Sequence, residues 1–186
     1  NQESIVFIGQ KPRFASVNLG YIEYGPEIKN VDGVSVYEFK DFKYRPDEEL
    51  ANTFLNDNKH SWNLGYFVTT PKFLWGQYEK NAPELFEKLL LISEKVGTEE
   101  YEEVLNETYP TLEKISLDNE IFEKIDHSSG MVLSVDIGWS YIGAWEALKE
   151  ALAVSEDENV TKGNVDLVES KDSLVFNSNG QLVVGI

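Results

Sequence analysis

The segment that most constrains the fold is a short strand that leads through a glycine-bounded turn into a helix. The run Met131-Val-Leu-Ser-Val135 is mostly apolar, which is typical of a buried strand. The turn Asp136-Ile-Gly-Trp-Ser-Tyr-Ile-Gly follows it, and apolar residues then recur at helical spacing, which predicts a helix over 143–153. Because ligands in α/β folds lie at the carboxyl ends of strands, this βα corner is a candidate site. The alternative is that its tryptophans and glycines merely pack a tight turn.

The composition is that of a folded, acidic chain. Its 186 residues, 41% of them hydrophobic, are enough for one domain or one domain with a short appendage. The formal net charge of −17 repels the phosphates of nucleic acids and of anionic membranes, so we expect neither as a partner. The sequence contains no cysteine, which excludes disulfides and thiolate chemistry. No apolar run reaches the roughly 18 residues of a membrane span, and we predict a cytoplasmic protein.

Local patterns predict an alternation of strands and helices in the first 154 residues. Short apolar runs bounded by glycine or proline indicate strands, and Asp32-Gly33 between two of them predicts a hairpin. Pro46-Asp47, with acidic residues directly after it, predicts a helix start. The predicted elements are strands at 4–8, 20–24, 34–39 and 62–68, a helix from Pro46, a helical cap over 71–112 and a helix that begins near Ser116.

The last part of the chain has a different pattern. Residues 155–159 form an acidic linker, and three short apolar runs follow at 164–168, 174–176 and 182–184. Asn179-Gly180 between the last two runs predicts a hairpin. We therefore expect two domains, 1–154 and 155–186.

Several stretches resemble, in the same order, motifs of the mannose-1-phosphate guanylyltransferases, which are members of the nucleotide-sugar pyrophosphorylase family. The resemblance implies an α/β fold, the sugar-binding half of a doubly wound, Rossmann-like nucleotide-diphospho-sugar transferase domain, followed by short C-terminal β-strands. This half is the C-terminal part of the family's catalytic domain, and the glycine-rich loop that grips the nucleotide phosphates in the family is not found in these 186 residues. The matching stretches are Gly9-Gln-Lys-Pro12 (GIKPT in the family), Gly20-Tyr-Ile-Glu23 (GYGYIE), Trp62-Asn-Leu-Gly65 (WNSGMF), Ser116 to Lys124 (SIDYAVMEK) and Trp139 to Trp145 (WSDxGxW).

The resemblance implies four substrate-binding residues, and each also has a plain structural explanation. Gly20 would let the backbone approach the sugar, or it eases entry into a strand. Arg45, which stands where the family's FxEKP motif has its lysine, would contact the sugar phosphate, or it lies in a solvated basic loop. Asn63 would bind the hexose hydroxyls, or it is a turn residue before Gly65. Asp118 would border the sugar pocket, or it caps a helix.

The resemblance also implies magnesium as a cofactor, with an incomplete set of ligands. The family has an aspartate, thought to bind the metal, where this chain has Tyr141, and a neutral phenol is a poor ligand for a hard divalent cation. Asp136 is the candidate metal ligand in its place, although it can instead fix the turn by bonding backbone amides. We assign no catalytic residue.

The function implied by the resemblance is nucleotidyl transfer, in which GTP and mannose 1-phosphate yield GDP-mannose and pyrophosphate. We expect the present chain alone to be inactive, because the nucleotide loop is missing and Tyr141 stands at the metal position. The alternative is a catalytically degenerate homologue that binds a sugar nucleotide or regulates an active enzyme, and a purely structural acidic domain is a third hypothesis. The expected partners are a sugar phosphate and a nucleoside triphosphate or sugar nucleotide, and a homo-oligomer is left open.

Overall fold

The computed structural model describes residues 4–143, 145–155 and 157–185, and these residues form two compact units. The first unit ends at Ile137 and the second begins at Gly138. The first contains a five-stranded sheet with helices, and the second contains one helix and two strands. The predicted α/β class with C-terminal strands is confirmed. The predicted division between 154 and 155 lies inside the second unit.

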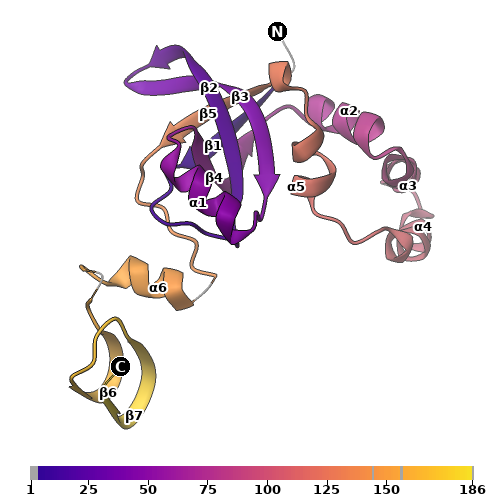
Figure 1. Cartoon of the computed structure of the whole chain (residues 1–186). Coiled ribbons are helices and arrows are strands. Elements are labelled where there is room, and N and C mark those ends of the chain that lie inside the picture. The colour runs from indigo at the N-terminus through magenta and orange to yellow at the C-terminus, as the bar shows by residue number, and fades with distance from the viewer. Residues whose placement is uncertain (1–3, 144, 156, 186) are drawn as a thin grey trace. The chain divides into compact units, whose positions relative to one another are not determined.

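The sheet of the first unit closes on itself (Figure 1). Its strands follow the order β1-β4-β2-β3-β5, and β5 also pairs with β1. β1 and β5 run parallel, whereas the other neighbours around this ring are antiparallel. This part of the chain therefore contributes a mixed sheet. The strands are β1 (Ile5–Gln10), β2 (Gly20–Val31), β3 (Val34–Tyr44), β4 (His60–Val68) and β5 (Gly130–Val135).

β2 and β3 form the predicted hairpin. Val31 pairs with Val34, so Asp32 and Gly33 are the two turn residues. Both have positive φ, 51° and 86°, as the two-residue turn that suits strand twist requires. The residues beside the turn are exposed, and the tip of the hairpin extends beyond the other strands (Figure 1).

Aromatic rings fill the core of the first unit. Phe7 of β1 is fully buried, and its ring centroid lies 5.1 Å from that of Phe39, 6.0 Å from Phe42 and 5.1 Å from Phe122. Such tilted and edge-on pairs add to the free energy gained by burying the rings. Phe122 comes from the segment after α5, so this segment closes one end of the core. The core therefore fixes the position of the α5 region against the strands.

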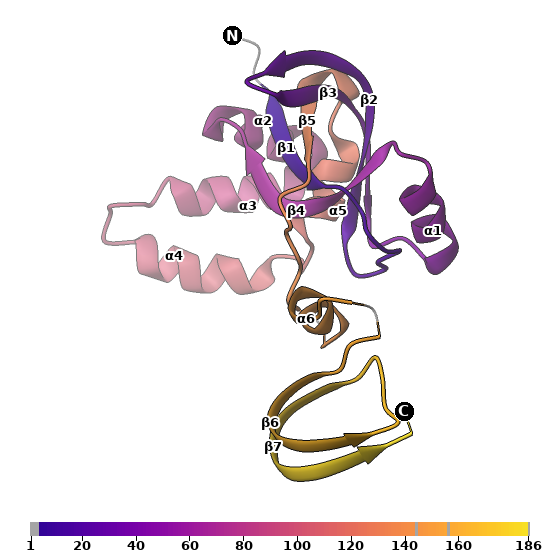
Figure 2. The ribbon, with the colours of Figure 1, turned by 90° about the vertical axis from the view of Figure 1, so that its left-hand side faces the viewer.

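The helices of the first unit begin and end where the sequence provides caps and breakers. The Leu50 backbone N–H donates to the side chain of Asp47 (2.9 Å), which caps α1 (Glu48–Asn56) near the predicted helix start. The predicted cap over 71–112 is three helices, because Pro83 starts a new helix and Gly97 (φ 83°) lies in the following turn. Figure 2 shows them at one side of the sheet. They are α2 (Pro71–Asn81), α3 (Pro83–Ser93) and α4 (Tyr101–Thr108); the short helices are α5 (Leu117–Glu120) and 3-10 turns at Tyr109–Thr111, Phe122–Lys124 and His127–Ser129.

The second unit contains α6 (Trp145–Leu152), β6 (Val160–Val168) and β7 (Leu174–Val184). The predicted hairpin at Asn179-Gly180 is wrong, because β7 runs through both residues and pairs in parallel with β6. Asn164 pairs with Asn179 and Val165 with Gln181, which leaves Gly180 as a bulge with φ of 100°. An Asn-Gly pair supplies positive φ, and here a bulge uses that property in place of a turn.

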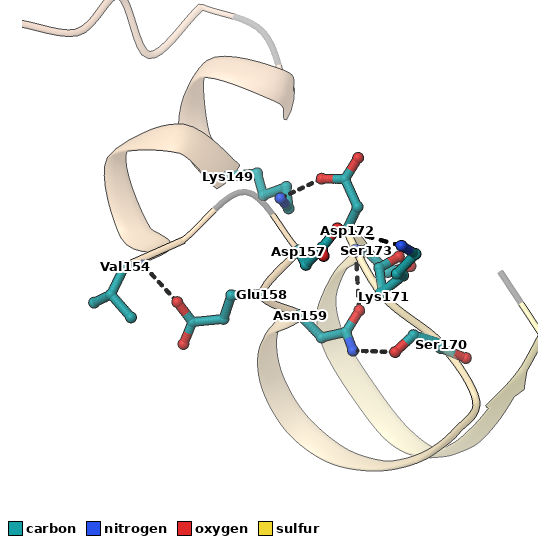
Figure 3. Close-up of polar contacts among 9 residues, drawn as sticks. All are labelled: Lys149, Val154, Asp157, Glu158, Asn159, Ser170, Lys171, Asp172 and Ser173. Atoms are coloured by element: carbon teal, nitrogen blue, oxygen red, sulfur yellow. Dashed lines mark hydrogen bonds and ion pairs between the residues drawn. The ribbon is translucent and has the colours of Figure 1, made fainter.

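Polar contacts tie the helix of the second unit to its strands (Figure 3). Lys149 of α6 pairs with Asp172, in the loop before β7. The Asn159 amide donates to the Ser170 carbonyl (2.6 Å) and accepts from the Ser173 backbone N–H (3.1 Å). These contacts hold the loop between β6 and β7 against Asn159, the residue that precedes β6.

Across the described ranges, none of the helices has the length and hydropathy that a membrane crossing requires.

Candidate functional site

The four predicted substrate-binding residues come together at one end of the sheet. Gly20 starts β2 and pairs with Tyr44 at the end of β3, which puts it beside Arg45. A Cβ atom at Gly20 would lie 3.4 Å from the Asn63 Cβ atom and 3.1 Å from the Phe42 ring. Asn63 in turn contacts Asp118 of α5. We call Gly20, Arg45, Asn63 and Asp118 the strand-end cluster.

Asn63 lies at an irregularity of β4, and its side chain makes two different contacts. The register with β1 shifts from Ile8 opposite Tyr66 to Gly9 opposite Asn63, so two residues of β4 bulge. Inside this bulge the Gly65 backbone N–H donates to Asn63 Oδ1 (3.0 Å), while Asn63 Nδ2 donates to Asp118 Oδ1 (3.0 Å). Asn63 therefore has the turn role that was its alternative, and its amide also contacts Asp118 of the strand-end cluster. Bulges often redirect side chains beside active sites.

Asp118 is not the helix cap that was its alternative role. Ser116 caps α5, because its Oγ accepts from the Asn119 backbone N–H (3.2 Å). Burial raises the pKa of the Asp118 carboxyl above its ordinary value, against smaller opposing effects from Asn63 and from the charge of Arg45. The carboxylate is thus held in a partly buried position next to one amide and one guanidinium.

Arg45 occupies an unusual backbone conformation. Its φ is 46°, in the left-handed region that non-glycine residues seldom adopt. Its backbone N–H donates to the Leu19 carbonyl (3.2 Å), and its guanidinium lies 5.0 Å from the centre of the Tyr44 ring. Arg45 is exposed, which agrees with the solvated loop that was its alternative, while its backbone is held by the contact with Leu19. A strained residue at such a place is a sign of function when other contacts hold it there.

Sequence reasoning missed Glu123, which also reaches this corner. Its Oε1 accepts from the Tyr44 backbone N–H (2.9 Å) and lies 3.6 Å from Lys43 Nζ. From the sequence, Glu123 is expected to be solvated surface together with Glu120. Tyr44 is 79 residues away from Glu123 in the chain, so no local pattern could have indicated this contact.

Asp136, the candidate metal ligand, is exposed at the end of β5 and is held by a buried side chain. Gln10 is fully buried, and its Nε2 donates to Asp136 Oδ1 (2.7 Å) while its Oε1 accepts from the Ile137 backbone N–H (3.1 Å). Within the described part of the chain, no three Asp, Glu or His side chains gather closely enough to hold a metal ion. Proteins usually bind Mg²⁺ through one or two carboxylates together with waters and substrate phosphates, so Asp136 can supply one ligand of such a site, and magnesium stays a prediction.

Tyr141, at the position of the family aspartate, packs within the second unit. Its ring stacks on Trp139 with centroids 6.3 Å apart, and a Cβ atom at Gly143 would lie 2.2 Å from the ring. Tyr141 is 45% exposed. Because glycine has no Cβ atom, Gly143 leaves room for the ring of Tyr141.

An open hollow of the first unit lies elsewhere, at the base of the β2–β3 hairpin. Its volume is about 800 Å³, and Tyr24, Tyr37, Lys40 and His127 are among its lining residues. It is open and lined by groups of both charges. We place the candidate site at the strand-end cluster instead, because there the polar side chains converge on one another. An amide, a carboxylate and a guanidinium together suit a ligand that carries both hydroxyls and an anionic group.

Known proteins with similar sequences include several that are named mannose-1-phosphate guanylyltransferase. The chain is 26% identical over 194 residues to mannose-1-phosphate guanylyltransferase 2 of Escherichia coli O157:H7, an alignment that covers 100% of this chain and 39% of that protein. It is 26% identical to the mannose-1-phosphate guanylyltransferase of Sinorhizobium fredii, with coverage of 97% and 34%. The chain resembles the mannose-1-phosphate guanylyltransferases. It spans between a third and two-fifths of the length of these relatives. No family model matches it.

A solved structure supports the fold. A Thermus thermophilus protein described as a mannose-1-phosphate geranyltransferase matches 100% of this chain and 51% of its own with a TM-score of 0.75 at 24% identity. The chain therefore shares its fold with part of that protein.

Proposed function

We propose that the strand-end cluster binds a sugar phosphate, as part of a protein that makes GDP-mannose and pyrophosphate from GTP and mannose 1-phosphate. The observation that carries this proposal is the convergence of Gly20, Arg45, Asn63 and Asp118 from four separate segments of the chain. The sugar, mannose, and the base, guanine, are taken from the names of the relatives. The location in the cytoplasm and the assembly into a homo-oligomer stay predictions.

The chemistry assigns a role to each residue of the cluster. Asp118 would accept hydrogen bonds from sugar hydroxyls, and the second Asn63 N–H would donate to one of them. The Arg45 guanidinium can give two parallel hydrogen bonds to a phosphate. Gly20 would leave the sugar room to approach the backbone.

In the proposed reaction a phosphate oxygen of mannose 1-phosphate attacks the α-phosphorus of GTP. The new oxygen–phosphorus bond forms as the bond to the bridging oxygen of the β-phosphate breaks, and pyrophosphate leaves with that electron pair. Positioning and neutralisation of charge are the main contributions a protein makes to such a transfer. The cluster would supply the positioning of the sugar phosphate. Magnesium stays a prediction, and we derive no step through it.

Calorimetric titration of the whole chain with mannose 1-phosphate and with mannose tests the binding role. Arg45→Ala should weaken mannose 1-phosphate binding by about tenfold and leave mannose binding nearly unchanged, because only the phosphate loses a partner. Asn63→Ala should weaken both ligands. Asn106→Ala, on exposed α4, is the control and should bind like the wild type. Equal affinities in all variants would refute the assignment.

The alternative function, a homologue that binds sugar nucleotide without turnover, is favoured by Tyr141 and by the incomplete metal site. Release of pyrophosphate from GTP and mannose 1-phosphate distinguishes the two. Binding of GDP-mannose without pyrophosphate release, by the wild type and by Tyr141→Asp, would support the alternative. Release restored by Tyr141→Asp would indicate an enzyme disabled at its metal position. A chain that binds none of these ligands would support the structural hypothesis.

A further inference from the structure

The corner that carries Arg45 depends on a contact with the segment after α5. Two successive backbone N–H groups are held there: that of Tyr44 by Glu123 Oε1 (2.9 Å) and that of Arg45 by the Leu19 carbonyl (3.2 Å). A hydrogen bond from a backbone N–H to a carboxylate is stronger than one to a neutral acceptor. Because a left-handed φ at a non-glycine residue is unfavourable by itself, surrounding contacts must hold Arg45 in it.

Glu123 is itself fixed on its own side. Its second oxygen accepts from Asn119 Nδ2 (3.4 Å), and Lys43 lies close enough to balance its charge. The side chain is 24% exposed. The carboxylate is therefore a bridge between the end of β3 and the segment that also presents Asp118.

Glu120 shows that this arrangement is specific. It is three residues earlier and similarly covered, with 20% of its side chain exposed, yet it pairs with Lys124 of its own segment (2.7 Å). The two glutamates have the same chemistry, and of this pair Glu123 is the one seen to bond the backbone beside Arg45.

We propose that Glu123 is a positioning residue of the sugar-phosphate site, whose carboxylate fixes the Tyr44–Arg45 corner and thereby sets the direction of the Arg45 guanidinium. The phosphate part of this inference rests on the proposed function. The corner also lacks the glutamate of the family's FxEKP motif, since Tyr44 takes its place. The Glu123 carboxylate, from a distant segment, thus contacts the backbone of Tyr44, the position that is a glutamate in the family motif.

Amide hydrogen exchange of the whole chain, followed by NMR, tests the corner without any ligand. Glu123→Ala should speed exchange at the Tyr44 amide by about tenfold or more, because that amide loses its acceptor. Glu123→Gln keeps an acceptor oxygen and should retain most of the protection. Glu120→Ala is the matched control and should leave the Tyr44 amide unchanged. Unchanged exchange at Tyr44 in Glu123→Ala would overturn the proposal.

A double-mutant cycle then tests whether Glu123 acts through Arg45. Glu123→Ala should weaken mannose 1-phosphate binding by about tenfold in the wild type and have almost no effect in Arg45→Ala. An equal loss in both backgrounds would overturn the positioning role. If the wild type binds no mannose 1-phosphate while Glu123→Ala still frees the Tyr44 amide, the proposed function fails and the fixing of the Arg45 corner is supported. Thermal unfolding of each variant shows whether it is folded.

Discussion

The close approach of β1 to β4 at Gly9 gives a quantitative prediction about packing. A Cβ atom at Gly9 of β1 would lie 2.5 Å from the Ser61 Cβ atom of β4. Carbon atoms attract each other best at about 3.5–4.0 Å, so an added methyl group overlaps by about 1 Å. Gly9 is not among the residues with positive φ, which means that crowding alone opposes alanine there.

The size of the effect follows from the neighbours. β1 pairs with β4 on one side and with β5 on the other, and Ser61 is fully buried, so neither strand can move without disturbing the ring. Overpacking of this kind costs about 1–3 kcal/mol, and replacing a strand glycine by alanine returns about 0.5–1 kcal/mol. We expect Gly9→Ala to lower the free energy of unfolding by about 1 kcal/mol.

A second substitution should relieve the crowding. Ser61→Gly alone should cost about 2 kcal/mol, because it removes the Ser61 Oγ to Ser134 Oγ hydrogen bond (2.7 Å) and places a glycine in a strand. In the double variant Gly9→Ala with Ser61→Gly the overlap is gone and alanine keeps its gain of about 0.5–1 kcal/mol, so the loss should be about 1 kcal/mol, well below the sum of the single losses, about 3 kcal/mol. Ser61→Ala keeps the Cβ atom and should not rescue Gly9→Ala.

Urea unfolding followed by tryptophan fluorescence measures these differences. Trp62 is 1% exposed and adjacent to Ser61, so it reports on this part of the barrel. The reasoning is refuted if the double variant is destabilised by the sum of the two single changes, or if Ser61→Ala rescues as well as Ser61→Gly.

Three further predictions concern single contacts. Because burial raises the pKa of Asp118 in the folded state, its ionisation costs stability as pH rises above about 4; Asp118→Asn should therefore raise the melting temperature at pH 7, and the gain should disappear at or below pH of about 4. Ser116→Ala removes the cap of α5 and should lower the free energy of unfolding in urea by about 1 kcal/mol, whereas a loss near zero would mean that the cap is dispensable. Lys149→Ala should destabilise the second unit by at most about 1 kcal/mol, and in a thermal scan this difference should shrink when salt is added; a salt-independent loss would contradict an ion pair with Asp172.

The elements that the sequence predicted well are those with a local cause. The turn at Asp32-Gly33 needs two adjacent residues with positive φ, and the cap of α1 needs one side chain three residues before an N–H group. Both requirements are met by residues that are close together in the sequence. The helical region over 71–112 was predicted without its internal divisions, which the structure places at Pro83 and around Gly97.

The errors and omissions have a common physical cause. Asn179-Gly180 has the same local signal as a hairpin turn, but the pairing of β7 with β6 decided that it is a bulge. The sequence offered two candidates for the cap of α5, Ser116 and Asp118. In the structure Ser116 is the cap, and Asp118 instead accepts a hydrogen bond from distant Asn63. Contacts between residues far apart in the chain therefore determine the candidate site, and a resemblance to a family could indicate its members but not their partners.

Closure of the barrel has a consequence for the order of folding during synthesis. β1 pairs in parallel with β5, and Ile5 lies opposite Gly130, so the ring joins residues 125 positions apart. At a synthesis rate of about 5–20 residues per second, β1 leaves the ribosome about 6 to 25 s before its partner. Until then its apolar edge has no partner on that side, and loop closure over such a distance is slow. A newly made chain of this kind should therefore depend on β4, which emerges earlier, or on a chaperone to protect β1 from aggregation.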